Sequence, residues 1–210
     1  MEIHNLFYGS YLSNCFVLIS EGEDGAKHAA VIDPSTPVEI IIDFVRSQNA
    51  VLDMIIMTHG HFDHILSLDK LRDMSGAPAI IHEDDAEMLG DGKKNAHYFF
   101  FRQNFVQRDA ERTVKHGDKL TLGNETLEVI HLPGHSKGSI ALLGDGFMIT
   151  GDTLFAEGFG RYDLYGGDAT ILKKSLESLK NYDSNLTIYA GHGEGARLGQ
   201  ALRAISYFIN

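Results

Sequence analysis

The sequence of 210 residues predicts an α/β protein in which two β-sheets pack together with helices on their outer faces. Three observations predict this class. Strand-like and helix-like segments alternate in the first half, short strands separated by tight turns fill the second half, and two helical segments flank one strand near the C-terminus. No composition typical of a linker and no internal repeat divides the chain, so we expect one domain over residues 1–210.

The first half alternates apolar runs with helical patterns. A helix is expected over Val38–Ser47, where apolar residues recur with helical spacing, and a second from about His64 to Met74. In the second helix, Ile65, Leu68 and Leu71 are expected to point inward. The strand-like runs are Ile3–Tyr8, Cys15–Ile19, Ala29–Ile32, Met54–Met57 and Ala79–Ile81. Alternation of this kind is typical of an α/β layer.

The second half contains short strands joined by glycine-containing turns, which predict hairpins and an antiparallel sheet. These strand-like runs are Thr113–Lys115, Lys119–Leu122, Thr126–His131, Ile140–Leu143 and Phe147–Ile149. Helices over Ala169–Leu179 and Glu194–Ile209 then flank a strand over Thr187–Ala190. Residues 90–112 form an insertion before the hairpins, and we expect this insertion to be a lid over an active site.

Charge and composition exclude several classes of protein. Asp and Glu number 29 against 18 Lys and Arg, and the net charge of −11 repels phosphate backbones, so no nucleic-acid partner is expected. No apolar run approaches the roughly 18 residues of a membrane helix, so no membrane partner is expected. The N-terminal residues lack the basic segment of a secretion signal, which predicts a cytoplasmic protein. The single cysteine, Cys15, excludes an internal disulfide framework.

The strongest functional signal is the segment Thr58-His59-Gly60-His61-Phe62-Asp63-His64, which directly follows an apolar run. His59 and His61 are two residues apart, so an extended strand end places both on the same side. The chain then turns into a helix whose first turn brings Asp63 and His64 to the neighbouring side of the same cavity. The segment can therefore give two nitrogens to one metal ion, and a carboxylate oxygen plus a nitrogen to a second.

Three more residues of metal-binding types follow later apolar runs. His135 ends the turn Leu132-Pro133-Gly134-His135, Asp152 follows the run Phe147–Ile149, and His192 lies between two glycines. In open α/β architectures, ligands bind in the crevice beyond the strand ends. We therefore expect these side chains to converge with the histidine-rich segment.

With these segments the chain resembles the metallo-β-lactamase superfamily, and within it the glyoxalase II-like metallohydrolases. The run Gly151-Asp152-Thr153-Leu154-Phe155, followed by Gly160-Arg161, is especially similar to that branch. The resemblance implies a four-layer αββα sandwich of two mixed sheets. It also implies a first metal ion on His59, His61 and His135, a second on Asp63, His64 and His192, and Asp152 as the carboxylate that bridges both.

Ligands of these types suit two divalent ions, zinc first, with iron or manganese as alternatives. Two cations about 4 Å apart can bridge a water and make it a hydroxide nucleophile near neutral pH. Asp63 and Asp152 are expected to act in catalysis by offsetting cation charge and fixing the distance between the ions. A thiolate leaves without a proton donor, because the pKa of its thiol is about 8.5, whereas an amine needs one. The expected activity is hydrolysis of a small thioester such as S-lactoylglutathione.

Two alternatives stay open. The same residues are compatible with a site that holds a single metal ion. Persulfide dioxygenases of the same superfamily use one iron on two histidines and one aspartate, and they share a segment similar to Gly160-Arg161-Tyr162-Asp163. An iron-dependent oxidoreductase is therefore the alternative to a hydrolase.

Other residues are expected to support the site or to contact the substrate. Asp33, with Thr58 as a further supporting residue, either holds a ligand histidine or caps the turn before Pro34. The expected substrate contacts are Arg161, Tyr162 and Phe100. Arg161 can bind a substrate carboxylate or pair with Asp163 or Asp168. The aromatic residues Tyr98–Phe101 and Phe105 form either a wall over the metal site or a local core.

Overall fold

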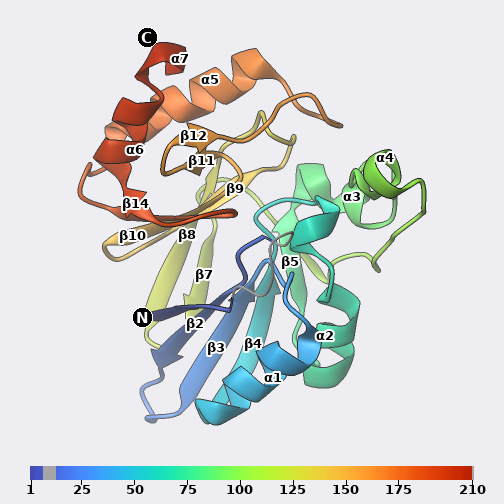
Figure 1. The fold of residues 1–210 in the computed structure, drawn as a ribbon. Coiled ribbons are helices and arrows are strands. Elements are labelled where there is room, and N and C mark those ends of the chain that lie inside the picture. Colours follow the sequence, from blue (N-terminus) through green and yellow to red (C-terminus); the bar gives the residue numbers. More distant parts are fainter. Residues whose placement is uncertain (7–12, 210) are drawn as a thin grey trace.

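A computed structural model describes residues 1–6 and 13–209 and shows two six-stranded sheets that face each other, with helices on both outer sides (Figure 1). This is the four-layer αββα arrangement that the sequence predicts. Both sheets are mixed, because each combines parallel with antiparallel strand pairs. Within the described ranges, no helix has both the length and the apolar character needed to cross a bilayer.

The first sheet has the strand order β1-β2-β3-β4-β5-β6. Its strands are β1 (Glu2–Asn5), β2 (Phe16–Glu21), β3 (Lys27–Ile32), β4 (Ala50–Ile56), β5 (Ala79–His82) and β6 (Arg112–Val114). The strands from β3 to β6 run parallel to one another. Their carboxyl ends therefore lie at the same edge of the sheet, where a ligand site is expected in such folds.

The second sheet has the strand order β14-β13-β10-β9-β8-β7. Its strands are β7 (Lys119–Leu122), β8 (Glu125–His131), β9 (Ile140–Gly144), β10 (Phe147–Gly151), β13 (Thr187–Ala190) and β14 (Ala196–Arg197). Strands β7 to β10 form an antiparallel meander, and β13 pairs in parallel with β10. A separate small hairpin joins β11 (Leu154–Phe155) to β12 (Gly158–Phe159); the sequence patterns did not predict it.

Three apolar clusters hold the four layers together. One lies between the sheets and contains buried residues such as Ile32 of β3 and Val129 of β8. Helices α1 (Val38–Ser47) and α2 (Leu68–Ser75) cover the outer face of the first sheet, where Ile41 and Leu71 are fully buried. Helices α5 (Ala169–Ser178), α6 (Leu198–Ala204) and α7 (Ser206–Ile209) cover the second sheet. The remaining short helices are η1 (Phe62–His64), η2 (Glu83–Asp85), α3 (Ala86–Leu89), α4 (His97–Phe101) and η3 (Leu179–Asn181).

The expected helix from His64 to Met74 is wrong in its first part. The chain makes one 3₁₀ turn, η1, and α2 begins only at Leu68. Ser67 holds the break, because its backbone N–H donates to the carbonyl of Pro34 at 2.8 Å and its hydroxyl donates to that of Thr36 at 2.7 Å. The inward positions of Ile65, Leu68 and Leu71 are confirmed, since all three are fully buried.

Three other assignments need correction. The run Thr113–Lys115 belongs to the first sheet, as β6, and not to the antiparallel meander, because residues 83–111 cross over and return it parallel to β5. The expected helix Glu194–Ile209 opens as strand β14 and breaks at the buried Ile205 between α6 and α7. The expected strand Ile3–Tyr8 begins and ends earlier, as β1, and its last two residues lie outside the described ranges.

Candidate metal centre

Strand ends from both sheets bring the predicted ligands to one place. The segment from Thr58 to His64 leaves β4 of the first sheet, whereas Asp152 and His192 follow the parallel strands β10 and β13 of the second. His135 lies in the loop between β8 and β9. The two sheets are joined here by a hydrogen bond from the N–H of Ile140 to the carbonyl of Thr58, at 2.9 Å.

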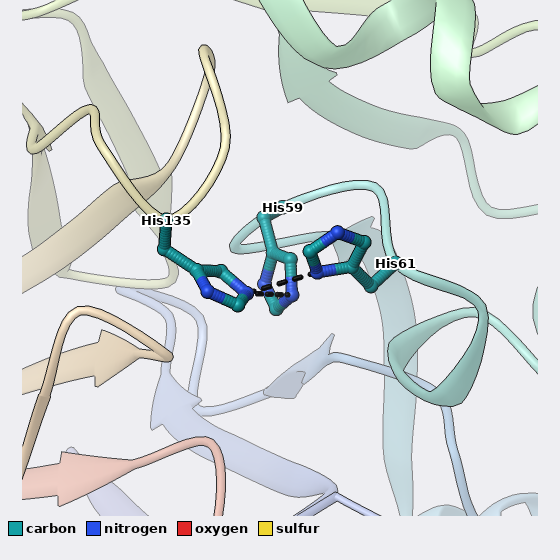
Figure 2. Close-up of side chains that lie close together, drawn as sticks. All are labelled: His59, His61 and His135. Carbon is teal, nitrogen blue, oxygen red and sulfur yellow. Dashed lines mark hydrogen bonds between the residues drawn. The ribbon is translucent and has the colours of Figure 1, made fainter. Parts of the chain in front are cut away.

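One group consists of three buried imidazoles, those of His59, His61 and His135. Nε2 of His135 lies 2.9 Å from Nδ1 of His61 and 3.2 Å from Nε2 of His59. Figure 2 shows the three rings turned toward one another, although His135 comes from a different sheet. Three ring nitrogens at these separations can direct their lone pairs at one cation. We call this group the histidine triad.

A second group combines Asp63, His64 and His192, and we call it the mixed triad. Nε2 of His192 lies 3.3 Å from Oδ2 of Asp63, and Nε2 of His64 lies 3.7 Å from the same oxygen. Asp152 lies between the two triads. Its carboxylate is 3.4 Å from both His64 and His192 and 3.7 Å from His135.

Two atoms at the junction of the triads are buried without a hydrogen-bond partner among the described residues, Nε2 of His64 and Oδ1 of Asp152. Buried polar atoms in folded proteins are nearly always paired, so each such atom needs an explanation. A nitrogen and a carboxylate oxygen that face each other at 3.4 Å can both bind one divalent cation. The residues present therefore fit a metal centre.

The protonation states of the two triads move in opposite directions. Burial, followed by the neighbouring imidazoles, holds the pKa of His59 well below its usual range and lowers that of His61 to about 3. Burial also acts to lower the pKa of His64, but the carboxylates of Asp152, Asp33 and Asp63 outweigh it and hold that pKa well above the usual range.

His192 and Asp152 stabilise each other's charged forms. Burial acts to lower the pKa of His192, but its hydrogen bonds to Asp152 and Asp63 raise the value to about 9. Burial acts to raise the pKa of Asp152, but His64 and His192 bring it well below the usual range. Without a cation, the mixed triad is therefore an ion-pair network, whereas His59 and His61 of the histidine triad are neutral.

Asp33 holds a histidine of the mixed triad, which was one of its two expected roles. Its Oδ2 accepts from Nδ1 of His64 at 2.8 Å and from the hydroxyl of Thr58 at 2.7 Å, and its Oδ1 accepts from the backbone N–H of Thr58 at 2.7 Å. A carboxylate on the outer nitrogen of a histidine fixes the ring and leaves Nε2 for a metal. The hydroxyl of Thr58 also lies 3.1 Å from Nδ1 of His59. Thr58 therefore contacts a histidine of the histidine triad as well as Asp33, which holds a histidine of the mixed triad.

Two supporting contacts were not predicted. The backbone carbonyl of Arg161 accepts a hydrogen bond from Nδ1 of His135 at 2.6 Å. Asp85 is fully buried just beyond β5, and its carboxylate binds the loops on both sides of the histidine triad. Asp85 follows the end of a strand, as the other site residues do. The expectation that ligands bind beyond strand ends, applied to residues 79–85, could therefore have found it.

The centre opens into a cavity of about 320 Å³. Apart from the residues of the two triads and Asp152, the cavity is lined by Phe62, Ala96, Phe100, Phe155, Gly160, Arg161 and Leu164. Most of this lining is apolar. Such a chamber is near the lower end of the size range of ligand pockets, which favours a small substrate.

The expected substrate contacts fall into two groups. Phe100 and Arg161 line the cavity, and the guanidinium lies 5.6 Å from the centre of the Phe100 ring. Arg161 also forms the ion pair that was its alternative role, since Nε and Nη2 donate to Asp163 at 2.7 and 2.8 Å. Tyr162 does not line the cavity, because its ring stacks with that of Phe208 at a centroid distance of 6.4 Å.

Residues of the aromatic insertion lie both at the cavity and against the core. Phe100 of α4 forms part of the cavity wall, and its ring lies 5.8 Å from that of Phe62. Phe105 instead packs against the core beneath the first sheet. Phe99 and Phe101 are each 56% exposed, so these two side chains of α4 face outward.

Comparison with known proteins agrees with this architecture. The model of the Metallo-beta-lactamase superfamily matches residues 8–192. An uncharacterised protein of Mycobacterium leprae is 35% identical over 212 residues, which cover 93% of each chain. The hydroxyacylglutathione hydrolase GloC of Haemophilus influenzae is 28% identical over 223 residues, which cover 100% of this chain and 99% of GloC.

Two solved structures are similar over nearly their whole length. The BLEG-1 B3 metallo-beta-lactamase superposes with a TM-score of 0.89, 28% identity and complete coverage of both chains. TTHA1623 in a di-iron-bound form superposes with a TM-score of 0.81 and 27% identity over 96% of this chain and 98% of that one. With the matched fold, the family match and the converging ligand residues, the chain belongs to the metallo-β-lactamase superfamily and is a protein of the metallohydrolase type.

Proposed function

We propose that this protein is a hydrolase of small thioesters that uses two divalent metal ions. The observation that carries the proposal is the pair of triads joined by Asp152 at the base of a small, mostly apolar cavity. His59, His61 and His135 would hold one ion, and Asp63, His64 and His192 the other. Asp152 would contact both.

A bound pair of divalent cations supplies a Lewis acid and a water of lowered pKa. The protein's own residues set the conditions for that chemistry. Asp63 and Asp152 place two negative charges among the histidines and limit the net charge of the centre. Phe62, Phe100 and Phe155 make the adjoining walls apolar, which excludes bulk water and strengthens electrostatic interactions within the cavity. Zinc is the proposed metal, and the di-iron form of TTHA1623 supports iron as the alternative.

The cavity lining favours a thiolate as the leaving group. Among the residues that the structure describes, the lining side chains outside the two triads and Asp152 are apolar except for Arg161, and a guanidinium does not give up a proton. An amine expelled from an amide or a β-lactam needs a proton, whereas a thiolate does not. The similarity to GloC, a hydroxyacylglutathione hydrolase, supports the same substrate class.

Arg161 is the proposed contact for a carboxylate of the substrate. Asp163 binds Nε and Nη2 and holds the guanidinium beside Phe100 at the cavity wall. Among the described residues, these two bonds leave Nη1 of Arg161 without a hydrogen-bond partner. A fixed guanidinium loses little side-chain freedom when it binds an anion, which suits it to orienting an acidic thioester.

The test is a substrate panel with purified protein reconstituted with zinc or iron. The panel contains S-lactoylglutathione, a short acyl thioester of N-acetylcysteamine, a β-lactam, and glutathione persulfide with an oxygen electrode. We expect thiol release from both thioesters, two equivalents of metal per chain, and turnover of the β-lactam lower by about a hundredfold or more. Oxygen uptake with the persulfide, one iron per chain and no thiol release would instead establish the dioxygenase alternative.

A further inference from the structure

We propose that Asp85 is a positioning residue for the histidine triad, which it assembles by tying together the two loops that carry its three histidines. The inference rests on the metal centre of the proposed function but not on the identity of the substrate. Asp85 is not itself near enough to be a ligand in either triad. Its role is to hold His135 against His59 and His61.

The hydrogen bonds of Asp85 reach both loops. Oδ2 accepts from the backbone N–H of Gly60 at 3.0 Å and from the hydroxyl of Ser136 at 2.6 Å. Oδ1 accepts from the backbone N–H of Gly138 at 2.7 Å. Gly60 stands between His59 and His61, and Ser136 directly follows His135. One carboxylate therefore fixes the backbone on both sides of the triad.

The packing around Asp85 leaves these loops little room to move. Asp85 is fully buried, and a Cβ atom on Gly138 would lie 2.8 Å from its Cβ. A Cβ atom on Gly60 would lie 2.6 Å from the Cβ of Met88 in α3. Both loops thus approach the segment from Asp85 to Met88 as closely as glycine permits. Neither can shift toward this segment, and the three hydrogen bonds prevent a shift away from it.

Burying a carboxylate is costly unless donors surround it. Burial raises the pKa of Asp85, while the hydrogen bonds from Ser136, Gly138 and Gly60 oppose that shift. All three donors are in place only when the two loops are docked together. The free energy of the buried carboxylate is therefore coupled to the arrangement in which the three imidazoles converge.

The main test replaces Asp85 by asparagine, which has the same shape but one acceptor oxygen instead of two. Asp85→Asn keeps two of the hydrogen bonds and places an amide N–H₂ against a backbone N–H. Loss of a residue that orients metal ligands typically lowers metal affinity by about 10–100-fold. We expect a loss of that size for the ion on the histidine triad and a change below about threefold for the ion on the mixed triad.

Metal affinity is measured by competition with a chelator, using cobalt, whose visible spectrum also reports ligand geometry. The two ions are told apart by repeating the measurement in a His192→Ala background, in which the mixed triad lacks one ligand. Ser136→Ala is a second, milder variant that removes one donor and leaves the carboxylate. We expect it to weaken the same ion by about threefold, so the role of Asp85 stays testable if Asp85→Asn does not fold.

Glu111→Gln is the control for a general loss of stability. Glu111 also ties distant segments, since it accepts from the N–H of Ala79 at 2.7 Å and pairs with Arg72, but it does so at the other end of β5. We expect it to lower the unfolding temperature without changing cobalt affinity or spectrum. Equal weakening of both ions by Asp85→Asn, unchanged affinity, or the same loss in Glu111→Gln would overturn the proposal. Since no substrate is used, failure of the thioester assay leaves this result standing.

Discussion

The two triads differ in burial and charge although one short segment contributes to both. The rings of the histidine triad are each at most 3% exposed, and no carboxylate belongs to it. The mixed triad reaches the cavity surface, where the side chain of His192 is 38% exposed, and it contains Asp63. His59 and His61 lie in the loop beyond the end of β4 at Ile56, whereas Asp63 and His64 lie in the 3₁₀ turn η1.

This difference sets how each triad meets a cation. In the histidine triad, burial lowers the pKa of His59 and His61, so these two imidazoles are neutral at pH 7 and their nitrogens are ready to bind. The histidines of the mixed triad are protonated, because the surrounding carboxylates raise their pKa. A metal ion must displace those protons. Metal binding by the histidine triad thus depends on geometry, whereas metal binding by the mixed triad depends on pH as well.

The largest expected effect follows from removing the residue that the triads share. Asp152→Asn removes a negative charge that faces both triads, and we expect kcat/KM for a thioester to fall by about a thousandfold. Metal content should fall from two equivalents per chain toward one, measured by elemental analysis. Asp53→Asn, at a half-buried pair with His28 away from both triads, is the control and should retain both metal equivalents and activity. Full activity in Asp152→Asn would show that the triads do not act together.

The affinity of the mixed triad should depend strongly on pH. At neutral pH each ion bound displaces one proton from His64 and one from His192, so affinity should rise about a hundredfold per pH unit, and less steeply above the pKa of His192 at about 9. The histidine triad should show no such rise above pH 6.5. Chelator competition at pH 7, 8 and 9 measures both positions. Parallel pH curves for the two ions would contradict the assigned difference in charge.

A smaller effect is expected at the cavity wall. Phe100→Ala removes an apolar wall and should raise KM by about tenfold while kcat changes less than twofold, because the ring contacts substrate and no reacting atom. Phe99→Ala is the matched control, since Phe99 is the adjacent residue of α4 and does not line the cavity. Steady-state kinetics with the best thioester measures both. Equal effects of the two variants would place the substrate outside this cavity.

The smallest effect concerns stability of the metal-free protein, prepared with a chelator. The pKa of His61 is lowered to about 3, so the unfolded chain binds a proton that the folded one does not, and stability falls as pH drops from 6.5 toward 3. The pKa of His192 is raised to about 9, so its stabilisation is complete below pH 6.5 and is lost as pH rises through 9.

Urea unfolding between pH 4 and pH 10 measures the free energy of unfolding as a function of pH, with an acid limb below pH 6.5 and an alkaline limb toward pH 9. His61→Gln should flatten the acid limb, and His192→Gln should flatten the alkaline limb. Each variant serves as the control for the other, because they belong to different triads. If both variants change the same limb, the opposite directions of the two pKa shifts are wrong.

Local patterns were sufficient for much of the fold. Helix α1 occupies Val38–Ser47 as predicted, and strand β13 occupies Thr187–Ala190. The helical spacing of apolar residues and the turn residues around short strands depend on neighbours in the sequence, so the sequence contains this information. The corrections concern contacts between distant residues. Strand β6 joined the first sheet through pairing with β5, and Tyr162 turned to Phe208.

The sequence by itself determined the αββα class, the set of histidines and aspartates at the strand ends, and Asp33 as a candidate support. Through the resemblance, the sequence also implied how these residues group and that Asp152 lies between the groups. Only the tertiary structure decided how closely the side chains approach one another and that Asp85 binds both loops. The physical reason is distance along the chain. Spacing fixes the side of a strand or helix on which a residue lies, whereas the meeting of His61 with His135 depends on how two whole sheets pack.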